Sequence, residues 1–206
     1  MPIRRSTEPA AKTSETFSGA DWYGLDISGQ RHTGAKFVDV VMTELVNTGA
    51  VFEECSFRRV RFNASVHTDA AFVNCTFASC SFFDVRFERC KMVGSTFDGC
   101  TFDMMKVEGG NWSHVSLASA DLTSAEFQGT RMLECVLTSS KLGGARLRDC
   151  ELTGATWDRA SLDGCDLRGS DISSIDPDAH PVRGAIMTYQ QALVIATALG
   201  IDLREE

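Results

Sequence analysis

Eight cysteines are the residues of this sequence best suited to chemistry, and they lie at positions 55, 75, 80, 90, 100, 135, 150 and 165. Cys55 and Cys75, and likewise Cys80 and Cys100, are 20 residues apart. Thiols can form disulfides, bind metals or act as nucleophiles. However, the sequence has no C-x-x-C pair and no Cys/His cluster, and cytosolic thiols usually stay reduced. We therefore interpret the cysteines as small core residues and expect no metal and no cofactor.

The other residues of the sequence also form no recognisable catalytic motif. No Ser/His/Asp arrangement, phosphate-binding loop or metal motif can be assembled from the sequence. We therefore expect a protein that is not an enzyme and that has no catalytic residues.

The cysteine positions are all multiples of five because the whole chain follows a five-residue period. Counted from Phe17 to Ile172, the central residue of each unit is apolar in 29 of 32 units, and the exceptions are His32, Asn47 and His67. The position two before each centre holds mostly Ala, Cys, Ser or Val and contains all eight cysteines. This period fits neither a helix, which repeats at 3.6 residues, nor a strand, which repeats at 2. It indicates a repeat architecture.

Charge and glycine follow the same period. Between residues 17 and 175 there are 36 Asp, Glu, Lys and Arg side chains, and none occupies the centre or the position two before it. Of the 15 glycines in this stretch, 13 lie two places after a centre, where a turn with positive φ is expected. Each unit therefore has two inward positions, three outward positions and one turn, as one side of a square coil requires.

Units such as ADLTS (120–124), CDLRG (165–169) and CTFAS (75–79) resemble the A(D/N)LXX unit of the pentapeptide repeat proteins. The resemblance implies an all-β solenoid, a right-handed quadrilateral β-helix with four units to a coil. The 32 units then make about eight coils, which stack into a rod roughly 38 Å long at about 4.8 Å per coil. With 20 residues per coil, Asn47 and His67 lie one above the other, and we predict that they form a buried hydrogen-bonded pair.

The ends of the chain depart from the repeat. Residues 1–16 have no period and are expected to be disordered, residues 17–175 form the solenoid, and residues 176–206 form a linker and a helix. Thr188 and Gln191 form a capping box and Gly200 provides a stop, which together predict a short helix from about Tyr189 to Leu199.

This helix is too apolar to be exposed on all sides, so we expect it to cover the last coil and to form a dimer interface. Its stretch GAIMTYQQALVIATALGIDL is similar to the ending of the mycobacterial fluoroquinolone-resistance (MfpA-like) pentapeptide repeat proteins, and that resemblance implies a homodimer of two rods joined end to end, roughly 80 Å long. The residues expected at the interface are Leu193, Val194, Ile195, Ala198 and Leu199.

Composition limits the partners. The formal net charge of −8 argues against direct binding to nucleic acid, which requires a basic surface. No apolar run is long enough to span a membrane and the first residues lack the apolar segment of a secretory signal, so we expect a cytoplasmic protein without a membrane partner.

One side of the expected coil concentrates the negative charge. We name it the acidic side, and its centres are residues 22, 42, 62, 82, 102, 122, 142 and 162. It holds six acids against the two bases Arg61 and Lys141, a net charge of 2 − 6 = −4. The six acids, which are the expected partner-binding residues, are Asp21, Glu44, Asp84, Asp103, Asp121 and Asp163.

The resemblance to MfpA-like and Qnr proteins implies a function for this surface. Those proteins are understood to mimic duplex DNA in the DNA-binding saddle of DNA gyrase, and in some cases of topoisomerase IV. They thereby compete with DNA and protect the enzyme from fluoroquinolones or toxins. The alternative is a structural or interaction module that binds another basic protein and has no effect on topoisomerases, because charged outward positions are common to all such solenoids. Unlike Qnr proteins, this chain has no loop that interrupts its repeat.

Overall fold

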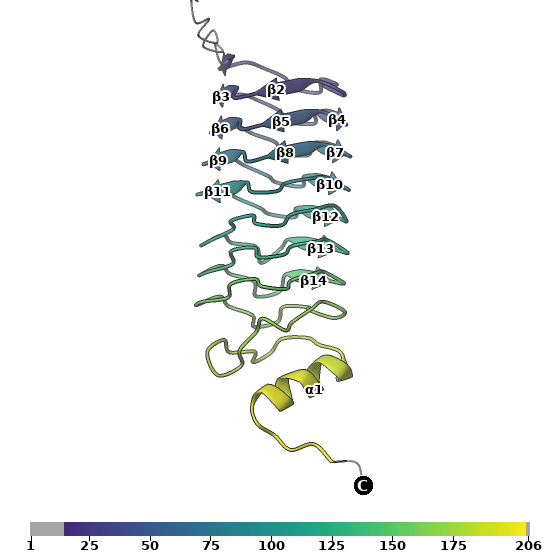
Figure 1. Cartoon of the computed structure of the whole chain (residues 1–206). Helices are drawn as coiled ribbons and strands as arrows, with labels where there is room; N and C mark the ends of the chain where they lie inside the picture. The colour runs from purple at the N-terminus through teal and green to yellow at the C-terminus, as the bar shows by residue number, and fades with distance from the viewer. Residues whose placement is uncertain (1–14, 205–206) are drawn as a thin grey trace, which may run out of the picture.

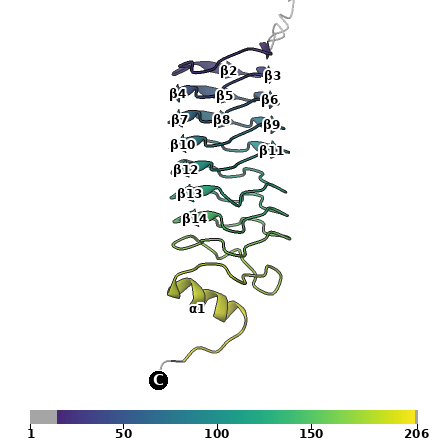
Figure 2. The same cartoon turned by 180° about the vertical axis from the view of Figure 1, so that it is seen from behind.

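The computed structural model describes residues 15–204, which form a straight stack of coils with one helix at the C-terminal end (Figure 1). The view from behind shows the same flat layers, with the helix α1 below the last of them (Figure 2). Disorder was expected for residues 1–16, and residues 1–14 lie outside the described part. Thr16 belongs to strand β1.

Three sides of the coil carry strands of three residues each, and every strand pairs in parallel with the strand one coil away. The five-stranded sheet contains β1 (Thr16–Ser18), β3 (Lys36–Val38), β6 (Ser56–Arg58), β9 (Thr76–Ala78) and β11 (Thr96–Asp98). The six-stranded sheet contains β4 (Val46–Thr48), β7 (Val66–Thr68), β10 (Arg86–Glu88), β12 (Lys106–Glu108), β13 (Glu126–Gln128) and β14 (Arg146–Arg148). The three-stranded sheet contains β2 (Arg31–Thr33), β5 (Val51–Glu53) and β8 (Ala71–Val73).

The fourth side is the acidic side, and isolated parallel bridges hold it together. Its bridges include Asp21 with Val41, Arg61 with Ser81, and Asp121 with Lys141. Each bridge joins residues 20 apart, so all four sides keep the register that the five-residue period predicts. The expected fold class, an all-β solenoid with a short C-terminal helix, is confirmed.

Stacked rings measure the rise of the coil. The centroids of Phe37 and Phe57 are 4.7 Å apart, and those of Phe57 and Phe77 are 4.8 Å apart. These values match the spacing of hydrogen-bonded strands, about 4.8 Å. From Phe17 to Trp157 the chain makes seven such steps, since 157 − 17 = 140 = 7 × 20, which gives eight levels and about 34 Å between the first and the last.

Most corners of the coil require a left-handed backbone two residues after the centre. Glycine meets this requirement at many corners, but Glu44 and Asp84 adopt it as well, with φ of 55° and 53°. A residue with a Cβ in this region carries a cost of roughly 1–2 kcal/mol, which the ladder of hydrogen bonds between coils must offset.

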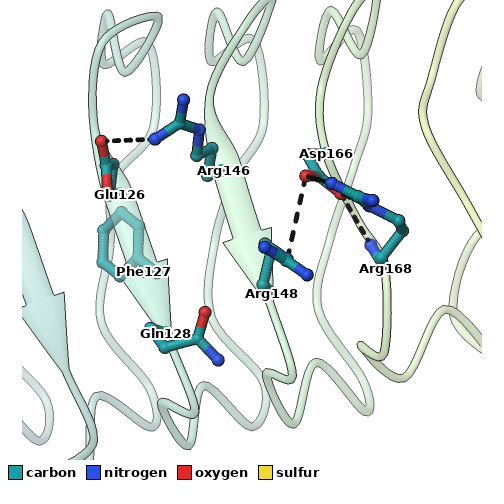
Figure 3. A pocket seen from close by; sticks show the side chains of 7 residues that line it. All are labelled: Glu126, Phe127, Gln128, Arg146, Arg148, Asp166 and Arg168. Atoms are coloured by element: carbon teal, nitrogen blue, oxygen red, sulfur yellow. Dashed lines mark hydrogen bonds and ion pairs between the residues drawn. The ribbon is translucent and has the colours of Figure 1, made fainter.

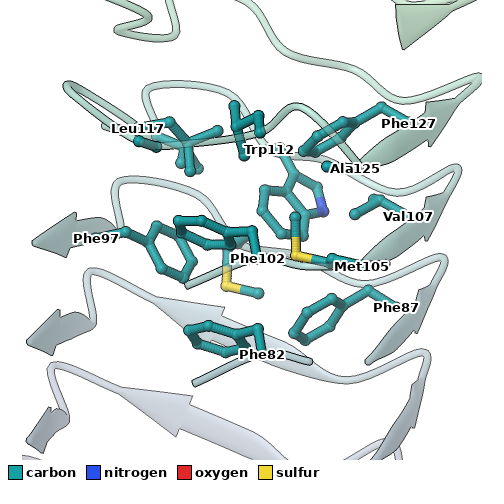
Figure 4. Close-up of a cluster of buried hydrophobic side chains, with 14 of the residues drawn as sticks. Phe82, Phe87, Phe97, Phe102, Met105, Val107, Trp112, Leu117, Ala125 and Phe127 are labelled. Carbon is teal, nitrogen blue, oxygen red and sulfur yellow. The ribbon is translucent and has the colours of Figure 1, made fainter. Parts of the chain in front are cut away.

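The core changes character along the rod. In the first coils the centres are mostly stacked phenylalanines, and beyond Trp112 they are mostly leucine. Figure 4 shows this transition, where Phe97 and Phe102 give way to Trp112 and Leu117. Both kinds of centre are buried, so the interior is filled with side chains from end to end.

The ladder continues beyond Ile175, where the apolar pattern of the sequence ended. Asp166 pairs with Ile186, and Leu167 donates its backbone N–H to the Ile186 carbonyl at 2.8 Å. Val182 and Met187, both still in the five-residue frame, pack against the core. The last coil is therefore completed by residues that the sequence pattern assigned to a linker.

The helix α1 (Tyr189–Ala198) covers this last coil. Its predicted capping box is present: the Thr188 side chain accepts from the Gln191 backbone, and the Gln191 side chain accepts from the Thr188 backbone. Among residues 15–204 no helix is long and apolar enough to cross a membrane.

Candidate protein-interaction surface

The six acids of the acidic side follow one another along the axis of the rod. Asp84, Asp103 and Asp121 lie on three consecutive coils, and Glu44 and Asp163 lie two coils beyond them at either end. Five of the six are exposed, and Asp84 is partly buried. The structure thus brings the six predicted residues onto one continuous face.

Several acids on the other three sides are neutralised by a base one coil away. Arg59 makes two hydrogen bonds with Asp39 at 2.6 and 2.7 Å, and Arg89 makes two with Asp69 at 2.8 and 2.9 Å. Each guanidinium lowers the pKa of the carboxyl that it contacts. Such pairs leave little net field, because the two charges lie within one side-chain length of each other.

The acidic side has one such pair. Lys141 contacts Asp121 at 3.3 Å, and Asp121 also accepts a hydrogen bond from the Thr123 hydroxyl, which is the main cause of its lowered pKa. Within residues 15–204 the carboxylates of Asp84, Asp103 and Asp163 make neither an ion pair nor a hydrogen bond. These three charges remain available to a basic partner, whereas Asp121 is partly neutralised.

Two large apolar side chains are exposed between these carboxylates, and sequence reasoning missed both. Phe83 is 48% exposed and Met104 is 50% exposed. Phe83 precedes Asp84, and Met104 follows Asp103 on the next coil. Exposed aromatic and methionine side chains surrounded by polar groups are typical of protein interfaces. Their outward positions in the frame, at 83 and 104, were the signal that could have found them.

The polar centres inside the coil form a closed hydrogen-bond chain, as predicted. The Ala50 N–H donates to Asn47 Oδ1 at 3.0 Å, which leaves Asn47 Nδ2 to donate to His67 Nδ1 at 3.1 Å. His67 Nε2 then donates to the Ser65 hydroxyl at 2.9 Å. Full burial lowers the pKa of His67 to about 3, so its ring is neutral at physiological pH. These groups are satisfied within the core and offer no access to a substrate.

The cysteines are free thiols, and all except Cys100 are buried. Over residues 15–204 no group of three or more His, Cys, Asp or Glu residues is arranged to hold a metal ion. The interpretation of the cysteines as core residues agrees with their positions.

A notch on the side that carries β13 and β14 has a mixed-charge lining (Figure 3). Arg168 contacts Asp166 through two nitrogens, at 2.8 and 2.6 Å, and Arg148 lies 3.8 Å from the same carboxylate. Arg146 donates to Glu126 at 2.9 Å. These charges pair with one another, and the notch adds no net charge of either sign large enough to select a ligand.

Sequence comparisons agree with this geometry. A family model described as a pentapeptide repeat region matches residues 80–157, and a second, described as pentapeptide repeats in eight copies, matches residues 140–176. Together with the unbroken 20-residue register, these matches decide the family. The chain is a pentapeptide repeat protein. No curated protein sequence matches it.

Solved structures share the fold of this pentapeptide repeat protein at low identity. Two trypsin-treated forms of QnrB1, a plasmid-mediated fluoroquinolone resistance protein, match with TM-scores of 0.52 and 0.53 at 17% identity. They cover 91% and 93% of this chain, and 99% and 98% of their own. HetL, a pentapeptide repeat protein involved in heterocyst differentiation regulation in the cyanobacterium Nostoc sp. strain PCC 7120, matches at 15% identity with a TM-score of 0.40. The match covers 84% of this chain and 87% of HetL.

The C-terminal end of the pentapeptide repeat protein gathers exposed apolar side chains. Residues 15–204 include twelve exposed large hydrophobic residues, and seven of them lie after residue 185: Ile186, Tyr189, Leu193, Val194, Leu199, Ile201 and Leu203. Among the five residues predicted at a dimer interface, Ile195 is buried against the last coil, and the other four are exposed. The helix therefore has one side that closes the solenoid and another that faces solvent.

Gln191 fixes the helix to the solenoid, and sequence reasoning assigned it only a capping role. Its side-chain nitrogen donates to the carbonyl oxygens of Leu167 and Ser170, at 2.7 and 2.8 Å. The same side chain closes the capping box, so one residue sets both the start of the helix and its position on the last coil.

Proposed function

We propose that this pentapeptide repeat protein binds DNA gyrase, or topoisomerase IV, by mimicking duplex DNA, and that it thereby protects the enzyme from fluoroquinolones or toxins. The observation that carries the proposal is the acidic side, which has the largest net negative charge of the four sides and on which Asp84, Asp103 and Asp163 contact no base within residues 15–204. The likeness of fold to QnrB1, a fluoroquinolone resistance protein, supports the same function.

The mimicry relies on the placement of charge more than on its density. Six carboxylates over eight levels give one charge per about 6 Å, whereas duplex DNA carries one per about 1.7 Å. A rod of this charge displaces fewer counterions from a basic groove than DNA does. We therefore expect its affinity to fall with salt less steeply than that of DNA for the same enzyme.

Two copies joined at their C-terminal helices double the length of this surface. The exposed apolar residues Leu193, Val194 and Leu199 favour such a homodimer, because a patch of this kind is costly to leave in water. A two-fold axis through the helices repeats the acidic side on both arms, and a two-fold symmetric enzyme then meets the same surface twice.

A second candidate function is an interaction module that binds a different basic protein. Phe83 and Met104 favour it, since DNA presents no comparable apolar groups, and a partner evolved for DNA has no reason to accommodate them. In this case the four neighbouring residues at 83, 84, 103 and 104 form the centre of an ordinary protein interface.

Gyrase supercoiling with the purified protein, in the presence and absence of a fluoroquinolone, separates the two functions. Inhibition at low salt, or protection from drug-induced cleavage, is the expected result of mimicry. If neither appears at micromolar protein, the DNA-mimic proposal fails, and Phe83→Ser then serves to trace the alternative partner by loss of binding.

A further inference from the structure

Cys80 and Cys100 occupy the same small inner position on adjacent coils. The Cys80 thiol lies 3.5 Å from the Phe57 carbonyl oxygen, and the Cys100 thiol lies 3.5 Å from the Phe77 carbonyl oxygen. In both cases the acceptor is 23 residues earlier, so the two side chains have the same orientation. One sulfur is therefore related to the other by one coil, a displacement of about 4.8 Å.

A surface notch opens onto Cys100, and Cys80 lies buried one coil below it. It is lined by Phe97, Asp98, Gly99, Cys100, Phe102 and residues 118–120. On the next coil Ala118, Ser119 and Ala120 have small side chains, which leaves Cys100 partly exposed. The one charged residue of the lining is Asp98, so the opening favours a cation.

We propose that Cys80 and Cys100 form a binding site for a soft cation that takes two thiolates in line, with Hg²⁺ as the best-suited ion. A metal–thiolate bond is about 2.3 Å long, so a linear sulfur–metal–sulfur unit spans about 4.6 Å, close to the rise of one coil. A disulfide requires the sulfurs at about 2.05 Å, so both side chains would have to turn away from their carbonyl oxygens and toward each other. The orientation that the two thiols have in the solenoid therefore suits a two-coordinate metal better than a sulfur–sulfur bond.

The binding step balances in charge and protons. Two neutral thiols and one Hg²⁺ give a neutral dithiolate complex and two protons, which leave through the notch. Soft thiolate ligands select soft cations, and a neutral complex avoids the cost of placing net charge inside the coil.

Cys55 and Cys75 provide an internal comparison. They have the same relation, with thiols 3.4 Å from the carbonyl oxygens of His32 and Phe52. Both are at most 1% exposed. The same spacing without an opening should bind the ion slowly or not at all in the folded protein.

The test uses the reduced full-length protein with one equivalent of mercuric chloride and an excess of glutathione, which removes mercury from single thiols. Native mass spectrometry and thiolate-to-mercury absorption in the near ultraviolet are the readouts. The wild type is expected to retain one Hg²⁺. Cys80→Ser and Cys100→Ser should each retain none, while Cys90→Ser and Cys55→Ser should still retain one.

Loss of all mercury from the wild type overturns the proposal, and so does retention by Cys100→Ser equal to the wild type. Serine occupies the same column at Ser140, so these variants should fold, and their thermal unfolding checks this. If Cys80→Ser does not fold, alkylation of native wild type provides a second test. Peptide mapping must find Cys100 modified first, and the alkylated protein must no longer retain mercury.

Discussion

The backbone N–H of Asp84 donates to the carbonyl oxygen of Asp103 at 2.9 Å, so these two unpaired carboxylates lie on adjacent coils of the acidic side. Phe83 and Met104 flank them, and no base contacts either carboxylate within the described residues. This arrangement makes the middle of the acidic side the best place to test the proposed function.

The double variant Asp84→Asn and Asp103→Asn is expected to weaken binding to a basic partner about fivefold. Two surface charge contacts of about 0.5 kcal/mol each account for a loss of this size. Asparagine tolerates the left-handed backbone at position 84, so the fold should persist. The measurement is the protein concentration that half-inhibits gyrase supercoiling.

The double variant Asp39→Asn and Asp69→Asn is the matched control. It removes the same formal charge, but from carboxylates that already contact Arg59 and Arg89 on other sides. Equal loss of inhibition in both double variants would show that only net charge matters, and the acidic side would then have no special role.

Leu193→Asp is expected to yield a monomer if the helix joins two rods. Leu193 is 37% exposed and shares a helix face with Tyr189, so a carboxylate there places charge in the apolar contact. Thr33→Asp adds the same charge at an exposed position of β2, near the other end of the rod, and should leave the dimer intact. Size-exclusion chromatography with light scattering measures both, and a wild type that elutes as a monomer rejects the proposed joint directly.

Gln191→Ala is expected to destabilise the C-terminal end by about 1–3 kcal/mol. The substitution leaves the Ser170 carbonyl oxygen without its donor, removes one of the two donors to the Leu167 carbonyl oxygen, and removes half of the capping box. Gln190→Ala, one residue earlier and exposed, should change stability little. Hydrogen exchange of the helix amides is the appropriate readout, and equal protection in the two variants contradicts a docking role for Gln191.

The five-residue frame was sufficient to predict the register of every side, because it states which residues face inward and which residue turns each corner. It could not predict the end of the solenoid. Pro177 and Pro181 interrupt the apolar pattern after Ile175, yet Val182 and Met187 keep their place in the frame and complete the last coil.

The frame also located the acidic side but did not distinguish its carboxylates. Lys141 contacts Asp121, whereas no base lies 20 residues from Asp103. Pairs such as Asp39 with Arg59 lie 20 residues apart, so a search at that spacing could have found them. Ile195 was expected at a dimer interface because it is apolar, but the orientation of the helix on the last coil buries it.

His67 is expected to make stability depend on pH above the range of the carboxylates. In the unfolded chain its pKa is about 6.5, and in the fold burial lowers it to about 3. Below pH 6.5 the unfolded chain therefore binds a proton that the native state excludes, and stability falls by about 1.4 kcal/mol for each pH unit. The free energy of urea unfolding, measured at pH 7, 6 and 5, gives the slope.

The double variant Asn47→Leu and His67→Phe should remove this slope between pH 6.5 and 5. Replacing both partners leaves no unsatisfied donor between them, but it removes the acceptor of the Ala50 N–H and the partner of the Ser65 hydroxyl, so stability at pH 7 should fall by about 1–3 kcal/mol. A slope that persists in this variant assigns the proton uptake to other groups.

Gly110→Ala is expected to be the most damaging of the small substitutions in the solenoid. Gly110 occupies an inner position just before Trp112, and a Cβ there would lie 2.2 Å from the Cys90 carbonyl oxygen. The neighbouring coil would have to move, which costs several of its hydrogen bonds, each about 1 kcal/mol.

Gly129→Ala is the matched control, because its φ is also positive but nothing lies within 4 Å of the new Cβ. The control should lose about 1–2 kcal/mol from backbone strain alone, and Gly110→Ala should lose clearly more in urea unfolding. Equal losses would mean that the coils can separate at Cys90 without cost, which the close packing of Trp112 argues against.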